Sequence, residues 1–482
     1  MTASLNIVWF RQDLRLTDNR ALRAAAADGA RVLPVYILDD DTPGAWKMGA
    51  ASRWWLHHSL EALGRSLADL GVPLVLRRGV IAEELSKLVT ETGAKGVYCS
   101  RSYEPWAIKL EHTLKASIEK AGAAFKRYPG TLLREPEDIK TKTGGPFKVY
   151  TPFWNALSSG ADPAKPQPAP AQLPPPVKLP KSDKLADWKL LPTKPDWAGG
   201  MRESWQPGEA GAELRLEAFL DETIAGYATS RDRPDKLGTS RLSPHLHFGE
   251  ISPARVWHAV MRHTGGDSLG KGELTFLKEI AWREFSHHLL FHFPDLPEKP
   301  FRPEFAAYPW KYQKAKLTAW QRGQTGYPIV DAGMRELWHT GWMHNRVRMI
   351  VASFLIKHLL ISWQQGEAWF WDTLVDADLA NNAASWQWVA GSGADASPYF
   401  RIFNPMKQGT TFDPDGHYVR RWVPEIAGLP DADLHAPWEA DAAALQSAGI
   451  VLGKTYPKPI VDHAEARTAA LDGYATVKAS GE

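Results

Sequence analysis

The sequence of 482 residues has only one cysteine, Cys99. A single cysteine cannot form an intramolecular disulfide, so nothing in the chain calls for an oxidising compartment and we expect a cytoplasmic protein. Long apolar runs are also missing. The apolar run nearest the N-terminus, residues 5–10, is too short for a signal peptide or a membrane span, and we interpret it as a first β-strand. We therefore expect no membrane segment.

Net charge is small, +2 from 57 basic and 55 acidic residues, so a nucleic-acid partner requires a local basic patch. No Gly-x-Gly-x-x-Gly motif follows the first strand, which makes a nicotinamide-dependent redox enzyme a remote alternative. What the chain does have is 22 tryptophans, with neither a repeat nor a membrane belt to account for them. The tryptophans therefore need a functional explanation.

Apolar and amphipathic segments alternate in the first part of the chain. The expected strands are residues 5–10, 32–38, 73–76 and 96–99, with helical stretches between them, so we predict an α/β domain with a doubly wound parallel sheet over residues 1–130. The stretch 161–197 is rich in Pro and Lys and reads as a linker, which we extend to 131–200. The apolar spacing of three and four that follows predicts an all-α domain over residues 201–475.

Two segments of the predicted helical domain place polar, aromatic and apolar side chains on one helix face. The residues that share a face are Glu279, Trp282 and Arg283 in one segment, and Asn345, Arg348 and Met349 in the other. A buried tryptophan beside a solvated ion pair is the plain alternative for each segment alone. Two such faces together predict a pocket.

Ser243 precedes a proline in the segment TSRLSP (239–244), and we expect it to cap a helix. The free amide groups of such a helix end attract phosphate, although a plain capped helix is the favoured interpretation of this segment alone. Asp376 and Asp378 lie two apart in a predicted loop. We predict no metal site, because neither clustered His and Cys ligands nor a calcium-loop spacing accompanies the two carboxylates. They are better interpreted as partners for sugar hydroxyls and for Arg348.

Taken together, these motifs resemble the photolyase and cryptochrome family over nearly the whole chain, from WFRQDLR (9–15) to RIFNP (401–405). The resemblance implies an N-terminal antenna domain and a helical domain that binds FAD in a folded, U-shaped form. Asn382 would face flavin N5, where a neutral amide suits the reduced anionic flavin. The residues that the resemblance implies for FAD binding are Tyr227, Thr239, Ser240, Arg241, Leu242, Ser243, Arg283, Arg348, Asp376, Ala377, Asp378 and Asn382.

The resemblance also gives roles to three tryptophans. Trp386, Trp363 and Trp310 match the family's electron-transfer chain that photoreduces the flavin, with Trp310 nearest the surface. Tryptophan is among the most easily oxidised side chains, which suits this role, although most tryptophans are only core residues. The sequence therefore predicts a light-activated flavoprotein.

The lesion-site pattern resembles that of enzymes that repair cyclobutane pyrimidine dimers in ultraviolet-damaged DNA. Related (6-4) enzymes have His where this chain has Asn345 and Met349, and relatives that prefer single strands usually have Gln at the place of Met349. The resemblance implies that Glu279, Asn345 and Met349 act on a flipped-out dimer, between apolar walls at Trp282 and Trp388. The residues implied for DNA binding are Trp282, Asn345, Arg346, Trp388, Arg401, Lys407 and Gln408.

Two places depart from the pattern of the best-known members. His358 stands where many bacterial dimer photolyases have an acid near the flavin, so its role is open. The segment YEPWA (103–107) differs from the segment that contacts folate in the best-known members. It looks like the corresponding segment of the bacterial class III group. For that group methenyltetrahydrofolate is the expected antenna, with a deazaflavin, a second flavin or an empty site as alternatives.

The rival function is a cryptochrome-like blue-light photoreceptor that uses the same flavin and tryptophans without repairing DNA. Asn382, the intact lesion-site residues and the short tail after the shared core count against it. We therefore expect a monomeric, light-driven repair enzyme for pyrimidine dimers.

Overall fold

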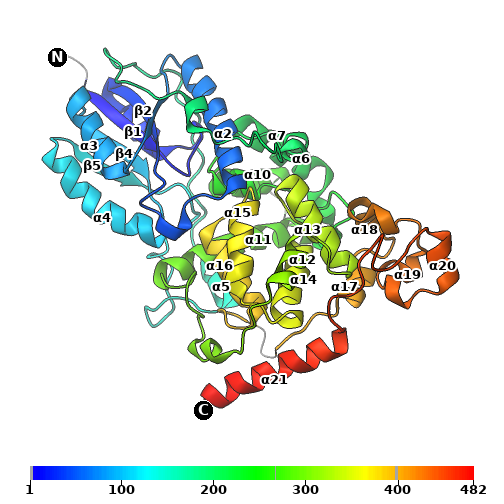
Figure 1. The fold of residues 1–482 in the computed structure, drawn as a ribbon. Helices are drawn as coiled ribbons and strands as arrows, with labels where there is room; N and C mark the ends of the chain where they lie inside the picture. Colours follow the sequence, from blue (N-terminus) through cyan, green and yellow to red (C-terminus); the bar gives the residue numbers. More distant parts are fainter. Residues whose placement is uncertain (1–3, 266–267, 397–399, 482) are drawn as a thin grey trace.

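The computed structural model describes residues 4–265, 268–396 and 400–481. An α/β domain at the N-terminus packs beside a larger helical domain (Figure 1). The C-terminal helix lies at the edge of the helical domain that is far from the sheet. Within the described part of the chain, every helix falls short of the length and apolar character that a membrane crossing needs.

The sheet has five parallel strands in the order β3-β2-β1-β4-β5, which confirms the predicted doubly wound topology. Four strands lie where the sequence predicted them, but β3 begins two residues later than expected, and β5 at the exposed edge was missed. The register places Ile7 beside Leu33 of β2 and Val97 of β4. The strands are β1 (Leu5–Phe10), β2 (Arg31–Leu38), β3 (Val75–Arg78), β4 (Gly96–Ser100) and β5 (Ala124–Tyr128).

Helices cover both faces of the sheet, because the strands are apolar on both sides. Val8 and Phe10 of β1 belong to the core with α1 (Arg20–Ala25) and α2 (Ala50–Asp69). Ile7 and Trp9 of the same strand belong to the core with the helices of the other face. Those helices are α3 (Ile81–Thr92) and α4 (Pro105–Lys120).

The segment predicted as a linker contains a helix, α5 (Tyr150–Ser158), which packs against α11 (Lys271–His292) of the helical domain. The remaining helices of the domain are α6 (Gly199–Ser204), α7 (Glu209–Glu222), α8 (Tyr227–Ser230), α9 (Ser243–His247), α10 (Pro253–His263), α12 (Lys314–Gln321), α13 (Pro328–Thr340), α14 (Asn345–Ser353), α15 (Trp363–Thr373), α16 (Leu379–Ala390), α17 (Pro405–Phe412), α18 (His417–Trp422), α19 (Asp431–Leu434), α20 (Ala442–Ser447) and α21 (His463–Gly481). Helices therefore dominate this domain, as the apolar spacing predicted.

The two domains meet where the chain leaves β1. Arg15, a buried residue, donates to the carbonyl of Gly249 at 2.8 Å, and the indole of Trp55 donates to Glu250 at 3.0 Å. Gly249 has φ +65°, and a side chain there would overlap the backbone of Gln12. Glycine at this position lets the turn after α9 approach the sheet domain closely.

Candidate functional site

The helical domain encloses a cavity of about 530 Å³ between α8, α9, α11, α14 and α16. A volume of this size is ordinary for a pocket that holds a cofactor or a small ligand. The predicted face of α11, with Glu279, Trp282 and Arg283, lines one side of it. The two predicted helix faces therefore do meet at one pocket, since the corresponding face of α14 also lines it.

Every residue that the resemblance implies for FAD lines this cavity. They are Tyr227, Thr239, Ser240, Arg241, Leu242, Ser243, Arg283, Arg348, Asp376, Ala377, Asp378 and Asn382. The same cavity is lined by most residues predicted to act on the lesion or to pass electrons to the flavin. These are Glu279, Trp282, Asn345, Arg346, Met349, Trp386 and Trp388. One continuous space therefore joins the two predicted sets, while their roles stay predictions.

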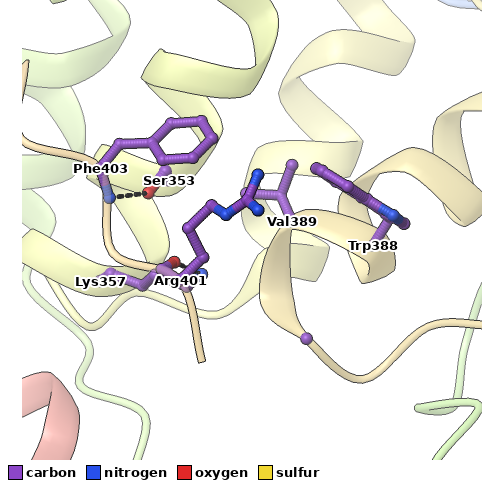
Figure 2. Close-up of a pocket in the computed structure, with 7 residues that line it drawn as sticks. Ser353, Lys357, Trp388, Val389, Arg401 and Phe403 are labelled. Carbon is purple, nitrogen blue, oxygen red and sulfur yellow. Dashed lines mark hydrogen bonds between the residues drawn. The ribbon is translucent and has the colours of Figure 1, made fainter. Parts of the chain in front are cut away.

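The other predicted residues lie outside this cavity. Arg401 lines a separate, smaller cavity beside Trp388 (Figure 2). Lys407 and Gln408 lie on α17. The DNA contacts of these three residues stay a prediction.

The three tryptophans of the predicted electron chain differ in burial as expected. Trp386 and Trp363 are buried in one core cluster, and Trp310 is half-buried at its edge. A side chain at Gly366 would overlap the Trp386 ring, so glycine allows α16 and its tryptophan to approach α15, the helix that begins with Trp363. The order from interior to surface is consistent with the predicted chain.

Arg348 and Asp376 form the expected ion pair across the pocket floor. The guanidinium of Arg348 donates to both oxygens of Asp376, at 2.8 and 3.1 Å, and to the carbonyl of Met343 at 2.7 Å. One terminal nitrogen of Arg348 makes both contacts with Asp376, and its Nε holds the guanidinium against the Met343 carbonyl. The carboxylate of Asp376 is therefore oriented by protein contacts.

Asp378 caps α16 and also faces two histidines. One oxygen accepts from the Asn381 backbone and side chain, at 2.9 and 2.8 Å. His287 and His247 lie 3.4 and 3.5 Å from the other oxygen. Burial by itself raises the pKa of Asp378, but these histidines hold the pKa well below its usual range. The ionised carboxylate of Asp378 therefore faces the pocket, and Asn381, His247 and His287 surround this carboxylate.

The segment before α9 corrects one prediction. Ser243 is the first residue of α9 and does not cap it, because Leu242 occupies the N-cap position. The Ser243 hydroxyl instead accepts from the indole of Trp342 at 3.3 Å. The predicted phosphate attraction from a Ser243-capped helix end is therefore not supported.

Arg241 supplies positive charge in the same segment. Its guanidinium lies 4.4 Å from the ring centroid of Trp205 and 4.8 Å from that of Trp342. Burial and the nearby Arg215 lower the pKa of Arg241 to about 10. The Nε of Arg241 is buried without a hydrogen-bond partner. An anionic group in the cavity would complete this environment, so the donor set fits a phosphate-bearing cofactor.

Glu279 and Trp282 line the pocket from α11. Glu279 forms an ion pair with Arg231. The ring of Trp282 stacks on Tyr150 of α5, with centroids 3.7 Å apart and planes 3° apart. Tyr150 is not among the residues that line the cavity, so it covers the face of Trp282 that points away from the cavity. The other face remains a flat apolar wall.

Comparison with known proteins agrees with this geometry. Residues 6–173 match the family model for DNA photolyase, and residues 276–476 match that for the FAD binding domain of DNA photolyase. A deoxyribodipyrimidine photo-lyase from Agrobacterium fabrum is 55% identical over 475 residues, covering 98% of both chains. The chain belongs to the photolyase and cryptochrome family.

Structural similarity within the family is high. A bacterial class III photolyase from Agrobacterium tumefaciens has a TM-score of 0.96 and 54% sequence identity, covering 99% of this chain and 98% of that one. Cryptochrome-1 of Arabidopsis thaliana is 38% identical, over 96% of this chain and 69% of that protein. The family membership and the fold that the resemblance implied are therefore both confirmed.

Two buried polar groups of this family member have protein partners that the sequence did not indicate. Asn382 donates its amide N–H to the carbonyl of Glu367 at 3.0 Å, which fixes the side chain on the pocket wall. His358 lies outside the cavity lining, and its Nε2 is 2.9 Å from Nδ1 of His463 on α21. The histidine that replaces the expected acid therefore contacts the C-terminal helix.

Some cavity residues of this photolyase-family chain escaped the sequence analysis. Arg231, His247 and Trp342 all line the pocket and contact predicted residues. Arg231 follows Tyr227 by four positions, and His247 follows Ser243 by four, so helical spacing could have found both. Trp342 carried no such signal, because its contact with Ser243 depends on the packing of distant segments.

Proposed function

We propose that this protein repairs cyclobutane pyrimidine dimers in DNA in a light-driven reaction with FAD as its cofactor. The observation that carries the proposal is the single cavity lined both by the residues implied for FAD and by Glu279, Asn345 and Met349. The name of the Agrobacterium fabrum relative, a deoxyribodipyrimidine photo-lyase, supports it further. The enzyme would act as a carbon–carbon lyase, in the cytoplasm and as a monomer.

The cavity fits FAD by the chemistry of its lining. Arg241 offers a buried cation and a free N–H for the phosphates, while Asp376 and Asp378 offer carboxylate oxygens for ribityl or ribose hydroxyls. Reduced FAD, when bound, supplies the light-excited electron that splits the dimer. Asn382 places a neutral amide on the same wall, where it can form hydrogen bonds but cannot act as an acid.

The lesion side of the pocket would hold a dimer flipped out of the DNA stack. Trp282 and Trp388 present flat walls to the bases, and Tyr150 supports Trp282 from behind. Glu279 has to give up its ion pair with Arg231 before its carboxyl group can form hydrogen bonds with the thymine bases. Binding of the lesion therefore includes a local rearrangement at Glu279.

Electrons would reach the pocket through the buried tryptophans. Trp386 lines the cavity, Trp363 lies in the same core cluster, and Trp310 is half-buried. The Trp386 indole N–H is buried without a partner. The arrangement supports an electron path from the surface to the pocket in the order Trp310, Trp363, Trp386.

The DNA backbone would be held by cationic and polar groups, of which Arg346 lines the pocket and the others lie outside it. Arg346, Arg401, Lys407 and Gln408 are the residues that we assign to it. Contacts with phosphates give affinity that is largely independent of sequence and sensitive to salt. The small net charge of the chain makes this local patch the main electrostatic attraction for DNA.

For the antenna we propose methenyltetrahydrofolate. A doubly wound sheet binds ligands at the carboxyl ends of its strands, where the strand order reverses, which here is between β1 and β4. Arg11 follows β1 at this edge, with its guanidinium 4.4 Å from the centroid of Trp9 and paired with Glu111 at 2.7 Å. Chromatography and absorption spectroscopy of the small molecules released from purified protein distinguish a folate from a deazaflavin, a second flavin or no antenna.

The repair proposal is tested by illuminating reduced holoprotein with a duplex that contains one thymine dimer. Restored thymines are quantified by chromatography, with a dark sample as the control. Light-dependent restoration is the expected result. Normal flavin photoreduction without restoration would refute the repair function and favour the photoreceptor alternative, for which the similarity to cryptochrome-1 is the main support.

A further inference from the structure

Three potential metal ligands lie together on α2, the helix of the sheet domain that packs against α15 (Figure 1). Glu61 follows His57 by four positions and His58 by three, so both imidazoles can reach its carboxylate across one helical turn. One ligand atom from each residue lies within 4.8 Å of the others. The absence of a metal was predicted at Asp376 and Asp378, which line the cavity of the helical domain. The cluster on α2 is a separate place.

The distances between the ligand atoms suit a small divalent ion. Nε2 of His57 lies 3.5 Å from one carboxylate oxygen of Glu61, and Nδ1 of His58 lies 3.2 Å from the other oxygen. Two ligand atoms of a tetrahedral Zn²⁺ ion, with bonds of about 2.0–2.1 Å, are roughly 3.4 Å apart. An ion therefore fits between the two imidazoles and the carboxylate after small side-chain rotations.

The protein holds the two imidazoles in place. The ring of His58 packs edge-on against the buried Trp54, with centroids 4.8 Å apart and planes 69° apart. His57 is itself buried, and the planes of the two imidazoles are 82° apart. The Glu61 side chain is 43% exposed. The cluster is therefore rigid on its imidazole side and open to an ion from solvent on its carboxylate side.

The charge of Glu61 is not balanced by a permanent cation. Among residues 4–265, 268–396 and 400–481, its only ion-pair contacts are those with the two histidines. A second group of possible ligands, Asp235, Asp415 and His417, differs in this respect. Arg233 pairs with both of those carboxylates at 2.7 Å, so a protein cation already occupies the place of a metal there. The cluster on α2 is the better candidate.

We propose that His57, His58 and Glu61 bind one divalent transition-metal ion, with Zn²⁺ as the representative and water in the fourth position. Imidazole nitrogen and carboxylate oxygen are ligands that Zn²⁺ prefers, and a neutral imidazole binds it without losing a proton. The ion would hold the middle turn of α2, just after Trp55, whose indole donates to Glu250 across the domain boundary. Metal binding would therefore stabilise the contact between the domains, whatever reaction the protein catalyses.

The surroundings of His57 indicate the strength of the site. Nδ1 of His57 is buried without a hydrogen-bond partner. A ligand histidine usually donates this N–H to an acceptor, and loss of such a contact weakens metal binding about 10- to 100-fold. We therefore expect a site of moderate affinity, which fills when Zn²⁺ is added and is emptied by a chelator.

The proposal is tested by calorimetric titration of chelator-treated, desalted holoprotein with Zn²⁺ at about pH 7.5, where imidazole is mostly neutral. His58→Ala and Glu61→Gln should each weaken binding at least about 10-fold. His112→Ala and Glu119→Gln are the matched controls, because both residues are exposed on α4, and they should bind as wild type does. Circular dichroism confirms that each variant is folded.

Two results of this titration would overturn the proposal. One is wild-type affinity in both His58→Ala and Glu61→Gln. The other is loss of binding in His417→Ala but not in His58→Ala, which would assign the ion to the second group of ligands.

Thermal denaturation gives a second readout. An ion that binds only the folded protein raises its melting temperature, so Zn²⁺ should raise the Tm of wild type. An equal concentration of Mg²⁺, which prefers oxygen ligands, should not. The increase should disappear in His58→Ala and persist in His112→Ala. No increase in wild type, or an increase that His58→Ala retains, would contradict the site.

Discussion

Glu367 on α15 is a buried carboxyl whose ionisation should weaken the fold. Only 1% of its surface is exposed, its Oε1 has no hydrogen-bond partner, and burial raises its pKa from 4.5 to about 9. The unfolded chain therefore releases this proton above pH 4.5, and the folded protein keeps it until about pH 9. Because the folded state binds more protons, stability falls as pH rises through this window. At about 1.36 kcal/mol for each pH unit, the loss between pH 5 and pH 8 is about 4 kcal/mol.

Glu367→Gln keeps the shape of the side chain and cannot ionise. We expect this variant to match wild type to within about 1 kcal/mol at pH 5 and to be more stable by several kcal/mol at pH 8. Thermal denaturation of the holoprotein in the dark at both pH values measures the difference. Glu119→Gln on α4 is the control, since Glu119 is 53% exposed. A stabilisation that is equal at the two pH values, or larger at pH 5, would refute the reasoning.

Three further predictions concern the site. Glu279→Ala should retain FAD and lower the dimer-repair quantum yield by about 2- to 10-fold, the value of one hydrogen bond, and an unchanged yield would remove Glu279 from the reaction. Trp386→Phe should abolish photoreduction of the oxidised cofactor but spare repair by chemically reduced enzyme, and equal photoreduction rates in variant and parent would exclude Trp386 from the electron path. Tyr150→Leu should weaken binding of dimer DNA about 5-fold, because it removes the aromatic ring that stacks on Trp282. Tyr150→Phe keeps the ring and is the control. Equal DNA affinities of the two variants would show that the stack on Trp282 does not affect binding.

The sequence predicted the elements whose signal is local. The apolar runs of β1, β2 and β4 are buried on both faces, so they are readable from a few consecutive residues. β5 has the sequence AFKRY and lies exposed at the sheet edge, so it has no apolar run to reveal it. Its strand conformation depends on pairing with β4, which no local pattern reports.

The site was predictable to the extent that helical spacing determines it. Residues three and four apart on α11 share a face wherever the helix packs, so Glu279 and Trp282 were found without a structure. The partners of those residues were not found, because Arg231 and Tyr150 arrive from other elements. The cap at Ser243 was wrong because Leu242 takes the capping position.

The small net charge of the chain has a structural counterpart at the mouth of the pocket. Arg231 pairs with Glu279, and Arg346 pairs with Asp232 at 2.8 Å, so two guanidinium groups that face the pocket already have carboxylate partners. Ion pairs that are partly open to solvent contribute only up to about 1 kcal/mol each, so a DNA phosphate can replace a carboxylate at little cost. The phosphate then adds the favourable release of counterions from DNA. Under the proposed function, Arg231 and Arg346 are therefore part of the local basic patch that DNA binding requires, and DNA would displace their acidic partners.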